Sequence, residues 1–348
     1  MPIIRCKSIS TASIRANRGF TVTELALASA VMAIIMPALM LVFLSANRGF
    51  TGFEATASLK QANQNTVNRM YLRLGRCKRL FQNDTIGAAM LAHLDLTGAP
   101  SLMSGSQLPT VQQNGSLEPS SGTFSSASFG NRLLFAYNSN TQMIHYDAAV
   151  ATTTFRIDLY KFAYYYLTPD NAPNIGAVHS YKTVEWQSKE YADCSQISSM
   201  SAGTKKVKVI NTLITAGITH CLTTSATDYT VAFSSIGVTG TSGTVTAAPT
   251  HTVKKDKPQV LTALVTGLMG TSYSYGVAPN TAGLSNITKP VPKFATVTGV
   301  FPAGLEFGIV GPSTARKVLI RSVLYAQGPM ATLIMDDQTL IAAARDIW

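Results

Sequence analysis

Apolar and polar residues follow two patterns along the chain, one helical and one typical of strands. From Leu25 to Ala46 the sequence contains no charged residue and is almost entirely apolar. At about 1.5 Å per residue, a helix of 22 residues spans about 33 Å, enough to cross a bilayer core of about 30 Å. We therefore expect residues 20–46 to form a transmembrane helix. Pro37 lies inside this run and is expected to kink or locally melt the helix, because proline removes a backbone hydrogen bond.

Beyond the apolar run the helical pattern continues in amphipathic form. Apolar residues recur at spacings of three to five positions, at Leu59, Ala62, Val67, Met70, Leu74, Cys77 and Phe81. This stripe predicts a helix to about Phe81 whose apolar side packs against a globular domain, with Cys77 as a buried thiol. We assign residues 47–96 to this helix and a connector.

Basic residues gather towards the end of the predicted amphipathic helix, at Arg69, Arg73, Arg76, Lys78 and Arg79. The simplest interpretation is a solvated face whose positive charge is favourably placed at the C-terminal end of the helix dipole. Contact with acidic neighbours or with nucleic acid is the alternative.

The rest of the chain predicts a loop-rich insertion at residues 97–130 and a β-rich head at residues 131–348. The expected strands are Arg132–Tyr137, Met143–Tyr146, Thr153–Leu159, Phe162–Leu167, Val184–Tyr191, Lys206–Asn211, Tyr229–Ile236, Val260–Leu268, Phe294–Phe301, Leu305–Val310 and Lys317–Leu324. Asn211–Gly217 fits a strand or a connector, and Thr239–Thr252 fits a loop or hairpin tip. Thr332–Met335 favours a strand, whereas Leu340–Arg345 favours a helix. The expected fold is α+β, with a long N-terminal helix packed on a mostly antiparallel sheet with long Ser/Thr/Gly-rich loops.

Three consecutive tyrosines, Tyr164–Tyr166, lie within one of these expected strands. Such a run could form a stacking surface for nucleic-acid bases. A strand with one face in the core and one at the surface is the more common arrangement, and we favour it here.

Composition and charge narrow the class of protein. Only 13% of residues are charged, about half the usual share, which favours exported β-rich material over a cytosolic enzyme. The formal net charge is +11. Residues 1–19 hold four basic residues and no acidic one, so without them 24 basic residues stand against 17 acidic ones, a net charge of +7.

The four cysteines are unevenly placed. Cys6 lies within residues 1–19, whereas Cys77, Cys194 and Cys221 follow. The last two lie in the expected head, where export would permit oxidation. A Cys194–Cys221 disulfide would close a loop of about 28 residues and stabilise the fold by about 3.5 kcal/mol. Two buried free thiols are the alternative.

No pattern in the sequence points to catalysis, a cofactor or a metal. The five histidines are scattered, at His93, His145, His179, His220 and His251. No Gly-x-Ser-x-Gly elbow and no phosphate-binding glycine loop occurs. Asp336 and Asp337 are adjacent and are expected to form a turn or surface pair, with calcium binding as a weak alternative. We therefore expect a protein that is not an enzyme.

The boundary before the apolar run carries the most specific signal in the chain. Gly19, Phe20, Thr21, Val22 and Glu24 stand between a basic segment and the apolar residues. An ordinary secretory signal peptide has its apolar core before the cleavage site, and here the order is reversed. The positive charges at residues 5–18 favour a cytoplasmic N-terminus and export of the C-terminal part. A carboxylate at the start of a membrane helix suggests a function, because intramembrane charges are costly.

This boundary resembles that of the type IV pilin and pseudopilin family, in which a basic leader ends in Gly and is followed by an aromatic residue, Thr, Leu or Val, any residue and Glu. The resemblance covers residues 15–45 only. It implies that a prepilin peptidase removes residues 1–19 by cutting between Gly19 and Phe20 and then N-methylates Phe20. It also implies a single-pass protein of the inner membrane, in contact with lipid, that joins other pilin or pseudopilin subunits in a pilus or a type II secretion filament.

Physical chemistry supports the role that the resemblance gives to Glu24. Cleavage would leave a cationic amine at Phe20, and Glu24 of a neighbouring subunit or of the same one would neutralise it in an apolar bundle. The segment Ala46–Thr51 repeats Ala16–Thr21, but it does not lead into an apolar run, so we do not expect a second cleavage site there.

The large head favours a minor pilin or pseudopilin over a bulk fibre subunit. A DNA-binding minor pilin for DNA uptake is the second hypothesis. It depends on the basic residues at 69–79 together with Lys205, Lys206, Lys208, Lys254, Lys255 and Lys257, and such binding should weaken steeply with salt.

Overall fold

The computed structural model describes residues 21–102, 105–117, 129–145, 153–170, 180–201, 203–222, 230–233, 259–260, 272–275, 287–290, 304–327 and 333–347. The chain divides into two compact units, Met1–Phe53 and Glu54–Trp348. The expected loop Thr239–Thr252 and the expected strand Phe294–Phe301 lie outside the described residues.

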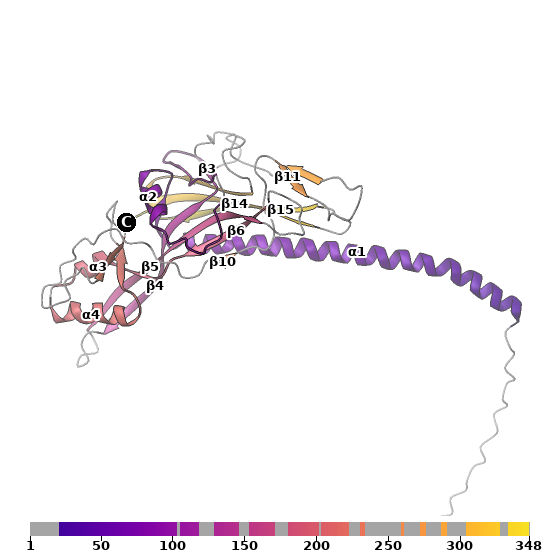
Figure 1. Ribbon diagram of the computed structural model, residues 1–348, viewed down its shortest axis with the longest axis horizontal. Coiled ribbons are helices and arrows are strands. Elements are labelled where there is room, and N and C mark those ends of the chain that lie inside the picture. The colour runs from indigo at the N-terminus through magenta and orange to yellow at the C-terminus, as the bar shows by residue number, and fades with distance from the viewer. Residues whose placement is uncertain are drawn as a thin grey trace, which may run out of the picture. The chain divides into compact units, whose positions relative to one another are not determined.

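Helix α1 is unbroken from Val22 to Leu74 (Figure 1). It remains helical through Pro37, so the expected local melting is absent. It ends at Leu74, and the expected continuation to Phe81 is wrong. Residues 77–81 form strand β1 (Cys77–Phe81), which pairs antiparallel with the edge of β4. This pairing is a tertiary contact that overrides local helical spacing.

A large sheet forms one layer of the head. Among the described residues its strands are β1, β4 (Leu133–His145), β5 (Thr154–Asp170), β6 (Ser180–Gln187), β7 (Tyr191–Asp193), β8 (His220–Leu222), β9 (Thr230–Ala232) and β10 (Gln259–Val260). The path is β1-β4-β5-β7-β8-β9, with β6 beside β5 and β10 beside β6. All pairs are antiparallel except β7–β8. The four separate strands expected between residues 132 and 167 are therefore one long β4–β5 hairpin.

A second sheet has the order β15-β14-β13-β2, with β3 also pairing with β13. Its strands are β2 (Val111–Gln112), β3 (Phe129–Gly130), β13 (Leu305–Val310), β14 (Arg316–Gln327) and β15 (Leu333–Ala344).

The strand expected at Leu305–Val310 is confirmed. The helix expected at Leu340–Arg345 is wrong, because Ala342 and Ala344 are buried while Ile341 is half-exposed, the two-residue alternation of a strand. A short separate hairpin joins β11 (Ser272–Tyr275) and β12 (Ile287–Pro290).

Three further α-helices occur in the described part of the head: α2 (Thr85–His93), α3 (Cys194–Ser198) and α4 (Thr204–Thr215). The strand expected at Lys206–Asn211 is wrong. In α4 the buried residues are Lys206, Val209, Ile210 and Leu213, spaced as on one side of a helix. The β-branched residues suggested a strand, but the periodicity of burial is helical.

The core explains how α1 is joined to the sheets. Val67, Met70 and Leu74 of α1 pack in one apolar cluster with residues of both sheets, including Tyr165. Tyr164 and Tyr166 point to the opposite face of the large sheet, in a second cluster with Trp186. Both faces at the three tyrosines are thus buried, and the expectation of one surface face is wrong. The long apolar helix and the antiparallel sheets make the fold α+β.

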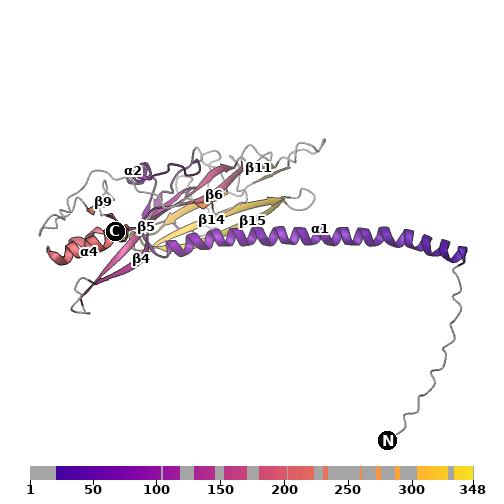
Figure 2. The same cartoon turned by 60° about the horizontal axis from the view of Figure 1, so that its bottom comes forward.

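The far ends of β4 and β5 form a separate lobe with α3 and α4, and α4 lies beside these strand ends in both views (Figures 1 and 2). Its own core joins Ile144 and Ile157 of the hairpin to Ile197 of α3 and to Val209 and Leu213 of α4.

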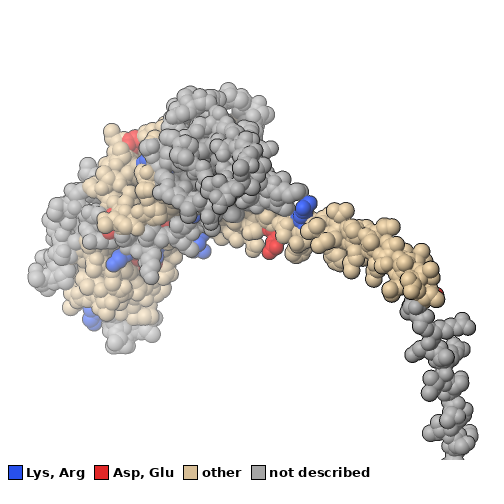
Figure 3. Space-filling model, turned by 45° about the vertical axis from the view of Figure 1, so that its right-hand side comes forward, with Lys and Arg blue, Asp and Glu red and all other residues tan. Residues whose placement is uncertain are grey.

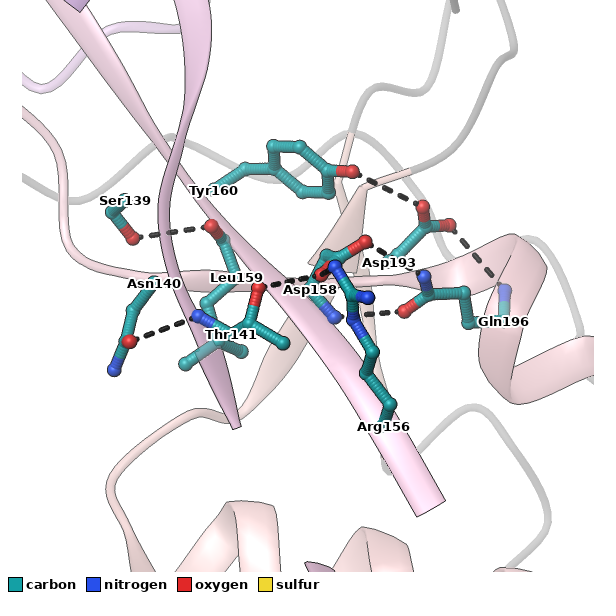
Figure 4. Close-up of polar contacts among 9 residues, drawn as sticks. All are labelled: Ser139, Asn140, Thr141, Arg156, Asp158, Leu159, Tyr160, Asp193 and Gln196. Carbon is teal, nitrogen blue, oxygen red and sulfur yellow. Dashed lines mark hydrogen bonds and ion pairs between the residues drawn. The ribbon is translucent and has the colours of Figure 1, made fainter. Parts of the chain in front are cut away.

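Polar contacts fasten this lobe to β5 (Figure 4). Asp158 accepts hydrogen bonds from Thr141 Oγ1 at 2.7 Å and from Gln196 Nε2 at 3.0 Å, and its own N–H donates to Gln196 Oε1 at 2.8 Å. Burial by itself raises the pKa of Asp158, but the hydrogen bonds from Thr141 and Gln196 and the charge of Arg156 outweigh it and leave the pKa below its ordinary value. Asp193 caps α3 by accepting from the Ser195 N–H at 2.8 Å.

Candidate functional site

The start of α1 is closed by a reciprocal pair of hydrogen bonds between Thr21 and Glu24. The Thr21 N–H donates to Glu24 Oε2 at 2.9 Å, and the Glu24 N–H donates to Thr21 Oγ1 at 3.3 Å. The Thr21 hydroxyl also donates to Glu24 Oε2 at 3.0 Å. This is a capping box, which satisfies two backbone donors that the helix itself cannot pair. Sequence reasoning missed it, although the Thr-x-x-Glu spacing was visible. Gly19 and Phe20 lie outside the described residues.

The surface of α1 that follows is apolar and exposed. The exposed large apolar residues include Leu27, Ile34, Met40, Leu41 and Phe43. Figure 3 shows this part of the helix as a continuous stretch without charged side chains on the face in view. Among the described residues, α1 alone is long and apolar enough to cross a membrane, judged by length and composition. An apolar surface of this size on a helix needs a cover of lipid or protein.

The C-terminal part of α1 is held to the large sheet by a buried carboxylate. Glu185 of β6 is fully buried and contacts Arg69 Nε at 2.7 Å and Arg73 Nη1. Gln187 donates a further hydrogen bond to it. Arg73 also donates to the Tyr165 hydroxyl at 2.9 Å, and burial raises the pKa of Tyr165 to about 12, so that this hydroxyl stays neutral. We call these five residues the Glu185 cluster.

The Glu185 cluster corrects the expectation of a wholly solvated basic face. Arg69 and Arg73 point to a buried acidic partner, with 36% and 17% of their side chains exposed. The sequence left contact with an acidic neighbour open, but it could not indicate that the neighbour is Glu185, far along the chain.

A second polar anchor joins α1 to the other sheet. Asn63 is fully buried and its Nδ2 donates to the Ser322 carbonyl at 3.0 Å and to Asp336 Oδ2 at 2.9 Å. Asp336 and Asp337 lie in strand β15 (Leu333–Ala344) and not in a turn. Asp337 is exposed, as expected of a surface residue, but Asp336 is buried, so the expected surface pair is wrong for Asp336. Asp337 accepts from Arg321 Nη2 at 2.7 Å on the other face of the strand.

Among the described residues, the remaining basic residues lie on different elements: Arg79 on β1, and Lys205, Lys206 and Lys208 on α4. Lys206 is buried in α4, and the Arg79 guanidinium lies 5.7 Å from the centre of the Phe81 ring. Lys254, Lys255 and Lys257 lie outside the described residues.

The cysteines fall into two kinds. Cys194 and Cys221 form a disulfide with a Cα–Cα distance of 5.0 Å, which joins the start of α3 to β8. Cys77 is a free, buried thiol. Burial and the nearby negative charge of Asp346 raise its pKa well above the ordinary value, so it is a core residue without nucleophilic character at neutral pH.

Comparisons with protein families, curated proteins and solved structures found no match for this chain. In the described part of the chain no group of three or more His, Cys, Asp or Glu side chains could hold a metal ion. His179 and His251 lie outside that part.

Proposed function

We propose that this chain is a structural subunit of the type IV pilin or pseudopilin kind, in the position of a minor subunit. A prepilin peptidase would remove residues 1–19 and methylate Phe20. The remaining chain would sit in the inner membrane through α1, with its head outside the cytoplasm, and then enter a pilus or a type II secretion filament. The proposal gives the protein no catalytic role.

The observation that carries this proposal is Glu24 at the first turn of an exposed apolar helix. In a plain membrane anchor this carboxylate would serve only to cap the helix, whereas its charge is costly near a bilayer. In a filament, where the helix packs against other helices, a cation beside Glu24 would neutralise the carboxylate and stabilise the packed state. The cleaved amine of Phe20 is such a cation.

The hydrogen bonds at the start of α1 support this pairing. Glu24 Oε2 lies 2.9 Å from the Thr21 nitrogen, and Phe20 is the preceding residue. A new amine at Phe20 would therefore be formed close to a carboxylate already turned towards that end of the helix. The positive end of the helix dipole also favours a carboxylate there.

The anchors in the head support a role in assembly. The Glu185 cluster and the Asn63–Asp336 contact attach the C-terminal part of α1 to both sheets. In a filament subunit these contacts would hold the part of α1 that lies in the second unit to the head. The DNA-binding alternative loses part of its basis, because Arg69 and Arg73 contact Glu185.

The test is incorporation of Glu24→Ala into filaments, with Glu54→Ala as the matched control. Glu54 is an exposed acid on the same helix. We expect Glu24→Ala to be cleaved normally and to be depleted from sheared filaments, while Glu54→Ala behaves as wild type. Equal incorporation of both variants would contradict the charge-pairing role of Glu24.

A further inference from the structure

Two aromatic side chains project from α1 just after the apolar run ends. Phe50 and Phe53 are 67% and 74% exposed, although their neighbours along the helix are small or polar. Arg48 precedes them, also exposed. We call residues 47–53 the exit segment. Two exposed phenylalanines so close to the apolar run extend its exposed apolar surface, which lipid or protein can cover.

The height of these residues along the helix axis places them in a definite layer. Counted from Ala46, the last residue of the uncharged run, Arg48 lies about 3 Å, Phe50 about 6 Å and Phe53 about 10 Å further along. The polar layer on each side of a bilayer core is about 5 to 8 Å thick. Helical side chains also lean towards the N-terminus, which here is the direction of the apolar run. Both rings therefore reach back into the level of lipid headgroups.

The angular positions of Phe50, Phe53 and Arg48 around the axis of α1 also fit the headgroup layer. At about 100° per residue, Phe50 and Phe53 are about 60° apart, and Phe43, which is within the apolar run, lies about 20° from Phe50. The aromatic side of the exit segment is thus continuous with the apolar surface. Arg48 lies about 160° from Phe50 around the helix axis. Its guanidinium is therefore on the opposite side of the helix from the two rings, at the level of the lipid phosphates.

We propose that the exit segment is an anchor for the membrane interface, with Phe50 and Phe53 seated among the headgroups of the outer leaflet and Arg48 on a lipid phosphate. Phenylalanine on an amphipathic helix suits this layer, where an apolar face is buried at the boundary between headgroups and acyl chains. The inference rests on the proposed membrane-embedded state of α1 before assembly. It adds that the head-proximal part of α1 is held at the membrane surface.

Depth-dependent fluorescence quenching tests this directly. The full chain is reconstituted in phosphatidylcholine–phosphatidylglycerol vesicles that contain lipids brominated either near the headgroup or near the chain end. Four variants are compared: Ile34→Trp, Phe50→Trp, Phe53→Trp and Ser58→Trp. The native Trp186 and Trp348 give a background that is measured with the unaltered chain and subtracted.

The expected order distinguishes this inference from the function on which it rests. Trp at 50 and at 53 should be quenched more by bromines near the headgroup, Trp at 34 more by deep bromines, and Trp at 58 by neither. Quenching at 34 without quenching at 50 and 53 would overturn the interface anchor alone. Absence of quenching at 34 would overturn the membrane-embedded helix as well. Protection at 50 and 53 that grows with the protein-to-lipid ratio would show that a second copy covers them, and would also overturn the proposal.

Discussion

Replacing Glu185 by Gln tests the main contact that joins α1 to the head. The carboxylate is fully buried and has Arg69, Arg73 and Gln187 as partners. The substitution keeps the shape of the side chain but removes the only negative charge that faces Arg73 in this cluster. Removal of one member of a buried ion pair costs about 3 to 5 kcal/mol, because the other charge stays buried without compensation.

The lower end of this range applies here. Arg69 retains access to water, with 36% of its side chain exposed, so it can turn outwards and recover part of its hydration. We therefore expect Glu185→Gln to lower the free energy of unfolding by about 3 kcal/mol. For a head of this size the corresponding fall in Tm is about 6 to 12 °C.

Urea and thermal unfolding of the full chain in detergent micelles, followed by the fluorescence of the buried Trp186, would measure this change. Glu190→Gln is the matched control, because Glu190 is only half-buried and accepts one hydrogen bond from Ser139 Oγ at 3.0 Å. It should cost about 1 kcal/mol or less. The double variant Arg73→Met with Glu185→Leu should recover most of the loss, since an apolar pair replaces a charged one. A Glu185→Gln effect no larger than that of the control would refute the reasoning.

Three further changes probe the head. Asn63→Ala should cost about 2 kcal/mol in urea unfolding, because it removes the buried hydrogen bonds that Asn63 donates to the Ser322 and Asp336 carbonyls and to the Asp336 carboxylate; no loss would mean that water replaces the amide. Cys221→Ser should cost about 3.5 kcal/mol and should expose the lobe to protease, and full resistance would contradict a structural disulfide. Asp158→Asn should destabilise the chain at neutral pH only. Because the folded-state pKa of Asp158 is lowered, its contribution is complete above about pH 4 and is lost as pH falls through the folded-state pKa. Equal destabilisation by Asp158→Asn in Tm scans at neutral pH and at about pH 2 would contradict this assignment.

Much of the architecture could be predicted where local sequence decides structure. The apolar helix follows from hydropathy alone, and the strand at Leu305–Val310 from a short, mainly apolar run, all of whose residues are buried in the structure. Prediction failed where long-range contacts decide. Cys77–Phe81 continues a helical stripe, yet it pairs with β4 as a strand. Lys206–Asn211 has the composition of a strand, but its apolar residues face one side of a helix.

The candidate site shows the same division. Glu24 could be singled out, because a carboxylate before an apolar run is conspicuous. Its partner Thr21 could have been identified from the capping spacing and was missed. The pairing of Arg69 and Arg73 with Glu185 could not be predicted, because nothing local to the helix indicates which distant acid is buried beneath it.

The central claim is that residues 1–19 are a leader removed after Gly19, and the mass of the mature N-terminus tests it most directly. The protein would be isolated from cells that contain an active prepilin peptidase and from cells that lack it. We predict a chain beginning at Phe20 with one added methyl group in the first case, and an unprocessed chain in the second. A chain that retains residues 1–19 in the presence of an active peptidase would contradict the account.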